Sequence, residues 1–171
     1  IIAGASIFIP SFSRGQNITN LFSQMAPMGI VALGQTFAII TTGIDLSVGS
    51  VMSLATVITA TQLEPGNPMS LLLVYPLVLG FSLFIGSFNG FIISKFNLEP
   101  LIATLATGSI INGISLLILS HPGGFCPRLF TNVWLTEIGG IVPLSIIYFF
   151  LLILITYFVL NHTRFGRRVY A

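Results

Sequence analysis

The chain contains five long runs of apolar residues, each about as long as a helix that crosses a lipid bilayer. They cover residues 21–42, 46–63, 70–94, 98–119 and 140–160. A hydrocarbon core of about 30 Å requires about 20 apolar residues in helical form. Backbone polar groups in lipid must pair within the protein, and unbroken apolar runs exclude the alternating pattern of barrel strands. We therefore predict an all-α, polytopic transmembrane helix bundle with five full spans.

The composition supports this class and limits the alternatives. Charged residues make up 6% of the 171 positions and hydrophobic ones 54%, and the mean hydropathy is +1.02. The apolar opening, residues 1–10, is too short to cross and lacks an initiating Met and a basic leader, so we expect the tail of a sixth span. The single cysteine, Cys126, is expected to be a small hydrophobe in a loop. A net charge of +2 is too small and too localised to indicate nucleic-acid binding.

The distribution of Lys and Arg predicts an orientation. If the loops at residues 43–45 and 95–99 share a side with the C-terminus, that side carries four basic residues and the other carries two. The four are Lys95, Arg164, Arg167 and Arg168, and the two are Arg14 and Arg128. The positive-inside rule then places the C-terminus in the cytoplasm. Residues 11–20, 64–69 and 120–139 lie outside, and the last segment suits either a re-entrant lid or a plain connector with an aromatic belt residue, Trp134.

One acidic residue stands between two of the spans. Asp45, in the motif GIDLSVGS at residues 43–50, is the only carboxylate between residues 1 and 61. Asp45 and Ser47 can accept hydrogen bonds from the free N–H groups of a helix beginning at Leu46, and Gly43 allows the chain to reverse before it. We predict that Asp45 and Ser47 cap this helix, with a gate or a solute contact as the other interpretation.

Mildly polar residues within the spans have two interpretations. Thr104, Gly108, Asn112 and Ser115 fall on one helix face, and two further spans carry ladders of small residues spaced by three or four. Those ladders are Gly49, Ser53, Thr56 and Ala60, and Ser82, Gly86, Gly90 and Ser94. Small residues allow helices to pack closely in lipid, which is the first interpretation. The second is a substrate path, for which the candidates are Gln35, Asn89, Thr104 and Asn112, with Phe91 as an aromatic face.

Several kinds of site are missing from the sequence. No span interior carries Asp, Glu, Lys, Arg or His, and there is no cluster of metal ligands, nucleophile motif or nucleotide-binding loop. A carrier driven by ions usually needs such groups at membrane depth. We therefore expect a transporter that is not an enzyme, binds no cofactor or metal, and takes its energy from another chain. The alternatives are a secondary carrier without an ATPase partner and a membrane-embedded enzyme, which would show clustered titratable groups.

A set of short motifs runs along the chain: NITNL at residues 17–21, residues 29–36 ending in GQT, IITTGIDLSVGS at 39–50, NG at 89–90, IATL at 102–105 and TRFGRRVYA at 163–171. In these motifs the sequence resembles the ribose-type sugar permeases of bacterial ABC importers. Order and spacing match over essentially the whole chain, and the pair formed by GIDLSVGS and TRFGRRVYA is specific. The segment around Glu99 departs mildly from the family, since Leu101 replaces its Phe.

The resemblance implies a function and a set of partners. It implies the pore subunit of a monosaccharide importer in the bacterial inner membrane, working by alternating access. The partners are a cytoplasmic ABC ATPase that binds ATP and Mg²⁺, an extracytoplasmic sugar-binding protein and a second permease subunit. Family members continue after the last motif with further spans, so residues 1–171 are expected to be the N-terminal part of a single permease transmembrane domain. Ribose, xylose, galactosides and sugar-derived signals all remain open as substrates.

The C-terminal motif is a candidate contact for the ATPase. A positive-inside anchor is the simpler interpretation, because three arginines lie within a few residues of a span end. Coupling is favoured by Gly166, which suits a turn or a close backbone contact, and by the apolar side chains of Phe165 and Tyr170. The candidate coupling residues are Thr163, Arg164, Phe165, Gly166, Arg167, Arg168 and Tyr170.

Overall fold

The computed structural model describes residues 15–64, 67–121, 123–124, 126, 136–138 and 142–170. The expected tail of a sixth span and Trp134 of the outer segment lie outside these residues. The chain divides into two compact units, one formed by Ile1–Phe37 with Leu129–Ala171 and the other by Ala38–Arg128. Each unit has its own packing, and they are described separately below.

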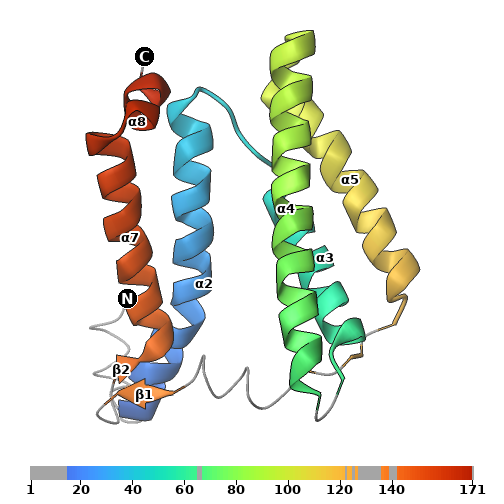
Figure 1. Ribbon diagram of the computed structural model, residues 1–171, viewed down its shortest axis with the longest axis vertical. Coiled ribbons are helices and arrows are strands. Elements are labelled where there is room, and N and C mark those ends of the chain that lie inside the picture. Colours follow the sequence, from blue (N-terminus) through green and yellow to red (C-terminus); the bar gives the residue numbers. More distant parts are fainter. Residues whose placement is uncertain are drawn as a thin grey trace, which may run out of the picture. The chain divides into compact units, whose positions relative to one another are not determined.

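The first unit contains most of α2 (Gly15–Ile40), the short strands β1 (Glu137–Ile138) and β2 (Val142–Pro143), and the helices α7 (Leu144–His162) and α8 (Arg164–Val169). The two strands pair antiparallel and lead into α7. Helices α2 and α7 lie side by side, as Figure 1 shows. They approach closely at Gly29, where a Cβ atom would lie 2.5 Å from the ring of Phe149.

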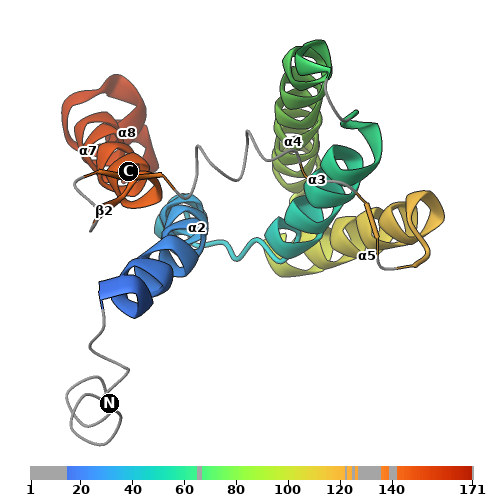
Figure 2. The same ribbon diagram turned by 90° about the horizontal axis from the view of Figure 1, so that it is seen from below.

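The second unit contains α3 (Val48–Gln62), α4 (Pro68–Phe96) and α5 (Pro100–Ile118). Helix α3 lies between the other two, as Figure 2 shows. Its Leu54 packs with Ile85 of α4 and Ile111 of α5 to form the apolar core of this unit. A contact of this kind fixes the three helices to one another without a large hydrophobic driving force, because lipid tails are as apolar as these side chains.

The helical class is confirmed, and the number of full spans is corrected. Four helices are long and apolar enough to cross a membrane, namely α2, α4, α5 and α7. The run at residues 46–63, predicted as a fifth full span, contains the 15-residue helix α3. At 1.5 Å per residue α3 is about 22 Å long, which is shorter than the hydrocarbon core. The difference lies at the ends of the run, because residues 46 and 47 are not helical and Leu63 is the C-cap of α3.

Helix α2 ends in a left-handed turn. The Thr42 N–H donates to the Ile39 carbonyl and the Gly43 N–H donates to the Ala38 carbonyl, which is the Schellman pattern. The left-handed residue is Thr42, with φ of 60°, so the reversal expected at Gly43 lies one residue earlier. Glycine is favoured at position 43 because an added Cβ atom would lie 3.3 Å from the Pro100 side chain.

The face predicted for α5 is confirmed except at Asn112, whereas the ladders predicted for α3 and α4 are not the packed faces of this unit. On α5, Thr104, Gly108, Ile111 and Ser115 are buried, whereas Asn112 is exposed. In the two predicted ladders, a Cβ added at Gly49, Gly86 or Gly90 would meet nothing within 4 Å among the described residues. Helix α3 instead packs through Ser50 and Leu54. The ladders are therefore not the surfaces that join α3, α4 and α5.

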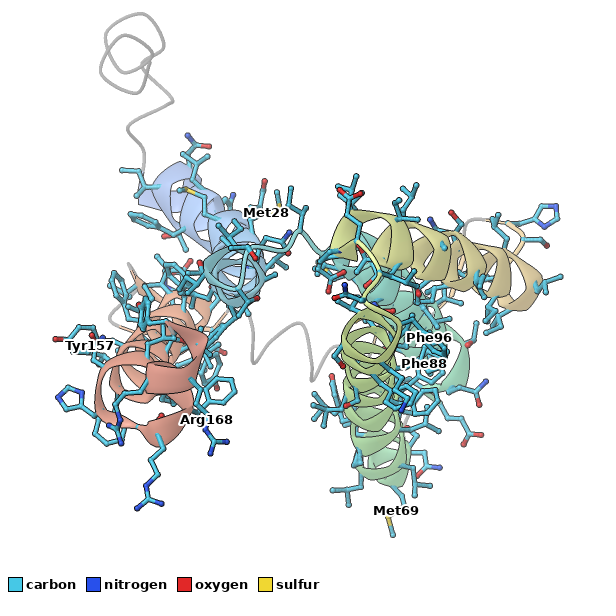
Figure 3. All side chains as sticks on the ribbon, turned by 90° about the horizontal axis from the view of Figure 1, so that it is seen from above. Met28, Met69, Phe88, Phe96, Tyr157 and Arg168 are labelled. Carbon is cyan, nitrogen blue, oxygen red and sulfur yellow. The ribbon has the colours of Figure 1, made fainter. Side chains whose placement is uncertain are left out.

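Much of the apolar surface faces outward. Figure 3 shows Tyr157 on the side of α7 that faces away from α2, and Met69 projecting away from the start of α4. Both side chains are exposed, as are most Leu, Ile and Phe residues of the long helices. Such an outer surface would be costly in water and is favourable in lipid, which agrees with a multi-pass membrane protein.

Candidate functional site: the break between α2 and α3

Polar groups from three parts of the second unit meet at residues 41–47, which we call the break. This segment connects the end of α2 to the start of α3 without helical hydrogen bonds of its own. Its Thr42 and Gly43 N–H groups bond to carbonyls of α2, and the Leu46 and Ser47 N–H groups bond to side chains. The contacts involve Asp45, Ser47, Asn89 and Thr104, and they bring together residues far apart in the sequence.

Asp45 closes a turn immediately before α3. One carboxylate oxygen, Oδ1, accepts from the Ser47 N–H at 2.8 Å and from the Ser47 hydroxyl at 2.6 Å. A side-chain oxygen that accepts from the backbone two residues on forms an Asx turn. The prediction that α3 begins at Leu46 is wrong, because it begins at Val48 with Ser47 at the N-cap. The Ser47 side chain makes no capping bond, since its hydroxyl is turned toward Asp45.

Asn89 of α4 joins this turn from the neighbouring helix. Its side-chain amide nitrogen donates to the Ser47 hydroxyl at 3.0 Å, so a chain of hydrogen bonds runs from Asn89 through Ser47 to Asp45. Both Asn89 and Ser47 are buried. Successive hydrogen bonds in a low-dielectric interior strengthen one another. The start of α3 is therefore held against α4 by polar contacts.

Thr104 of α5 provides a side-chain hydrogen-bond partner for the backbone of the break, which has no helical hydrogen bonds of its own. Its hydroxyl oxygen accepts from the Leu46 N–H at 3.1 Å and lies 3.2 Å from the Ile44 carbonyl. The same hydroxyl lies 2.8 Å from the Pro100 carbonyl of its own helix. Backbone polar groups in lipid must find partners inside the protein, and the buried Thr104 hydroxyl supplies an acceptor for the Leu46 N–H while its one hydrogen goes to the nearer Pro100 carbonyl.

Gly108 lets α5 approach the start of α3. A Cβ at Gly108 would lie 3.1 Å from the Ser50 hydroxyl, 3.5 Å from the Ser47 Cα and 3.6 Å from the Leu46 carbonyl oxygen. Its place on the polar face of α5 was predicted, but its partner Ser50 was not. The spacing of Ser47, Ser50 and Leu54 by three and four is the pattern that marks this face of α3.

Measured along α4, the break lies near the edge of the hydrocarbon core. Asn89, which bonds Ser47, lies about seven residues, or about 10 Å, before the end of α4. A 29-residue helix centred on a hydrocarbon core of about 30 Å extends about 7 Å beyond each side, which places Asn89 about 4 Å inside the core. Non-helical backbone at such a depth is tolerated where it is enclosed by protein or lines a cavity.

An open hollow of about 460 Å³ lies beside the break. Its lining comes from the end of α2, the break, α4 and the start of α5, and the polar members are Thr41, Asp45, Asn89, Ser94 and Thr104. The side-chain amide oxygen of Asn89, Oδ1, is buried and has no hydrogen-bond partner among the described residues. No three His, Cys, Asp or Glu side chains of the described part of the chain are grouped to hold a metal ion.

The structure brings together only part of the predicted substrate path. Asn89 and Thr104 meet at the break. Gln35 lies half-buried on α2 in the first unit, and Asn112 and Phe91 are exposed on α5 and α4. Asp45 and Ser47, which were predicted as a separate cap, belong to the same cluster as Asn89 and Thr104.

The C-terminal motif forms a compact turn in the first unit. Thr163 adopts extended backbone between α7 and α8, and its hydroxyl oxygen accepts from the Gly166 N–H at 3.2 Å. Gly166 is buried, and a Cβ there would collide with the backbone of Leu160, whose Cα lies 2.6 Å away. The close backbone contact predicted for Gly166 is confirmed. Phe165 and Tyr170 are exposed, with the Phe165 ring 6.2 Å from that of Phe37.

Replacing Asp45 by Asn should preserve the break, and replacing it by Leu should not. Asn keeps an oxygen that can accept from the Ser47 N–H, whereas Leu leaves that group and the Ser47 hydroxyl without their acceptor. A buried donor left unpaired costs about 1–3 kcal/mol. We expect Asp45→Leu to lower the thermal unfolding midpoint of the purified full-length protein and its transport, while Asp45→Asn stays near the parent. Loss of transport in Asp45→Asn at unchanged stability would show instead that the charge itself is required.

Comparison with known families gives a match over most of the chain. The family described as "Branched-chain amino acid transport system / permease component" matches residues 17–171. This range includes the break, the whole second unit and the C-terminal motif. No solved structure shows a significant match to the chain.

Individual relatives are similar over nearly its whole length. The ribose import permease protein RbsC of Bacillus subtilis is 37% identical over 174 residues, which cover 97% of the chain and 52% of the relative. RbsC of Haemophilus influenzae is 33% identical over 176 residues, which cover 100% of the chain and 54% of the relative. The D-allose transport system permease protein AlsC of Escherichia coli is 33% identical over 163 residues, which cover 94% of the chain and 49% of the relative. The chain thus spans about half the length of these relatives.

Proposed function

Because the chain belongs to the family of permease components of branched-chain amino acid transport systems, we propose that the full-length protein is the membrane-spanning subunit of an ABC importer for a monosaccharide or sugar-like solute. The observation that carries the proposal is the similarity to import permeases named for ribose and allose, at 33–37% identity over nearly the whole chain. The family description names amino acids, but the individual relatives are named for sugars. Residues 1–171 form the N-terminal part of its single transmembrane domain.

The energy for transport comes from other chains. ATP and Mg²⁺ bind to a cytoplasmic ABC ATPase, an extracytoplasmic binding protein delivers the sugar, and a second permease subunit completes the pore. Hydrolysis shifts the helices between outward-open and inward-open arrangements, and this chain performs no covalent chemistry. The protein lies in the bacterial inner membrane with the C-terminal motif in the cytoplasm, as the distribution of Lys and Arg favours.

The solute passes polar groups of the spans. Asn89 and Thr104 at the break, together with Gln35 and Asn112 elsewhere, provide hydrogen-bonding groups for hydroxyls. Asp45 and Ser47 hold the break in place through their hydrogen bonds to each other, with a gate as their second role. Discontinuous helices that meet at membrane depth are a recurrent way to build solute sites in transporters, which supports this assignment.

Transport and purification test the proposed function together. The full-length protein is expressed with its neighbouring transport genes in a strain that lacks its own sugar importers, and uptake of radiolabelled D-ribose, D-allose, D-galactose and D-fructose is measured. We expect accumulation of at least one sugar and co-purification of an ATPase. Uptake without any ATPase would identify a secondary carrier, and absence of uptake for all sugars would reject the proposed substrate class.

Helix α8 is the proposed contact for the ATPase, through Thr163, Arg164, Phe165, Gly166, Arg167, Arg168 and Tyr170. Exposed aromatic side chains are frequent anchors of protein interfaces, and Tyr170 is 61% exposed. We expect Tyr170→Ala to lower sugar-stimulated ATP hydrolysis about tenfold, a loss of about 1.4 kcal/mol. Tyr157→Ala is the matched control, because Tyr157 is 60% exposed on α7. If both variants hydrolyse ATP like the parent, α8 serves only as a positive-inside anchor.

A further inference from the structure

We propose that the apolar hollow between α2 and α7 receives a transmembrane helix from the half of the full-length permease that follows residue 171, and that this helix carries a hydrogen-bonding side chain opposite Gln24. The inference rests on the proposed function, in which residues 1–171 form the N-terminal part of the transmembrane domain, and adds where the two parts meet. It is carried by the shape of the hollow, the depth of Gln24 and the position of α8.

The hollow lies within the first unit and has a volume of about 540 Å³. The described residues that line it belong to α2, between positions 21 and 32, and to α7, between positions 146 and 150. Low and raised side chains stand next to each other in this lining. Ala26 is 2% exposed, whereas Met25 and Met28 are 63% and 71% exposed. Low positions between raised side chains form a groove, which suits the ridge of side chains of a third helix.

Gln24 makes lipid tails an unfavourable occupant of the hollow. It is an exposed member of the lining, and its side-chain amide makes no hydrogen bond to the described residues. Helix α2 has 26 residues and is about 39 Å long, so it extends about 4–5 Å beyond each side of a hydrocarbon core of about 30 Å when centred. Gln24, in the tenth position of α2, then lies about 9 Å inside the core. An amide at that depth is costly against lipid, and a polar side chain of a neighbouring helix would pair with it.

The position of α8 favours the helix that follows it in the full-length chain. Helices α2 and α7 run in the same direction, since Gly29 lies against Phe149 and both helices end on the side where α8 lies (Figure 1). The ring of Phe165 in α8 lies 6.2 Å from that of Phe37 near the end of α2, so α8 contacts α2 as well as following α7. Consecutive spans alternate in direction and usually lie side by side, so a span that continues from α8 returns antiparallel along α2 and α7. The chain covers 49–54% of its relatives, which leaves the length for such spans.

Photo-cross-linking in the full-length permease tests which molecule fills the hollow. The photoreactive residue p-benzoyl-L-phenylalanine replaces Met28 in one variant and Tyr157 in another, and both carry a protease site inserted after residue 171. Tyr157 is the matched control, because it is 60% exposed but lies on the side of α7 that faces away from α2 (Figure 3). After irradiation of the membranes and cleavage, we expect the two fragments to remain joined about fivefold more often from position 28 than from position 157.

Every other product from position 28 identifies a different occupant and overturns the proposal. A lipid adduct shows that the hollow faces the bilayer, a dimer of N-terminal fragments shows a second copy of the permease, and a cross-link within the N-terminal fragment shows another part of residues 1–171. Equal joining from positions 28 and 157 shows that the hollow does not direct the contact. The same membranes are assayed for sugar uptake. Joined fragments without uptake of any sugar reject the proposed substrate class alone, whereas uptake without joined fragments rejects the docking site alone.

Replacing Gln24 with leucine tests the polar contact through the sign of its effect. If Gln24 faces lipid, removing its amide should raise the thermal unfolding midpoint, whereas the loss of a hydrogen bond to a neighbouring helix should lower it. We expect Gln24→Leu to lower the midpoint of the full-length permease in bilayer nanodiscs by about 2–4 °C. Met25→Leu is the control, because it changes the adjacent exposed side chain without a change in polarity, and it should leave the midpoint at that of the parent. An unchanged or raised midpoint in Gln24→Leu would overturn the proposed contact.

Discussion

Replacing Gly166 with alanine is expected to destabilise the turn between α7 and α8 and to remove transport. An added Cβ would lie 2.5 Å from the carbonyl carbon of Leu160 and closer still to its oxygen. These are backbone atoms, so no side-chain rotation relieves the collision. Overpacking of this kind costs about 1–3 kcal/mol or more, which exceeds the helix-propensity gain of about 1 kcal/mol from Gly to Ala. The thermal unfolding midpoint of the purified full-length protein measures the effect.

Gly34→Ala provides the control for this prediction. Gly34 lies within α2, and a Cβ there would meet nothing within 4 Å among the described residues. We expect Gly34→Ala to match or slightly exceed the parent in stability. Equal unfolding midpoints for Gly166→Ala and the parent would show that Leu160 and Gly166 are not in close contact in the assembled protein.

The burial of Gly166 limits its use as a probe of coupling. Substitution of Gly166 by a larger residue alters the fold of the C-terminal turn as well as any surface offered to an ATPase. Loss of ATP hydrolysis in such a variant would therefore not separate a coupling role from a folding defect. Tyr170, which is exposed at the end of α8, is the better probe of the surface.

Replacing Gly108 with leucine is expected to separate α5 from the start of α3. The Cβ alone would lie 3.1 Å from the Ser50 hydroxyl and 3.5 Å from the Ser47 Cα, so the rest of a leucine side chain has no room. The helices must move apart, which breaks the contact between the Leu46 N–H and the Thr104 hydroxyl. The backbone of the break then lacks a partner at membrane depth, and a loss of several kcal/mol is expected from overpacking and the unpaired group together.

A graded series checks the cause of this effect. Gly108→Ala requires only that Ser50 move by a few tenths of an ångström, so we expect a small loss of stability. Gly113→Leu places the same large side chain on the same helix, at an exposed position with nothing within 4 Å of the added Cβ among the described residues. Gly113→Leu should retain folded yield and uptake. If Gly108→Leu is as stable as Gly113→Leu, the close approach of α5 to α3 does not support the fold.

The positions of the long helices could be predicted from the lengths of the apolar segments in the sequence. Four of the five predicted spans, those now formed by α2, α4, α5 and α7, are confirmed as helices long enough to cross a membrane. The reason is that the bilayer imposes its own length on apolar segments and forces their backbones into helices. The family could also be predicted, because its two motifs are short, specific and correctly spaced.

The start of α3 and the roles of its flanking residues required the tertiary structure. The run at residues 46–63 carries no charged residue, and hydropathy alone does not show that its first residues leave the helical path. Asp45 was correctly connected with Ser47, but the capping geometry was wrong, because the Ser47 hydroxyl bonds Asp45 rather than the helix. The partners that decide this geometry, Asn89 and Thr104, lie on other helices and more than 40 residues away.

The packed face of α5 could be predicted except at Asn112, but those of α3 and α4 were beyond the sequence. In a soluble helix the apolar stripe identifies the buried face, but in a membrane helix nearly every face is apolar, so the pattern carries little information on contacts. Several small-residue stripes were equally suited to close packing, including the one at Gly86 and Gly90, where an added Cβ would touch nothing in the described part of the chain. The sequence by itself determined the class, the long spans and the family. Only the tertiary structure selected Gly108 as the close contact and left Gly90 open beside Asn89, because that choice depends on which surfaces fit one another in space.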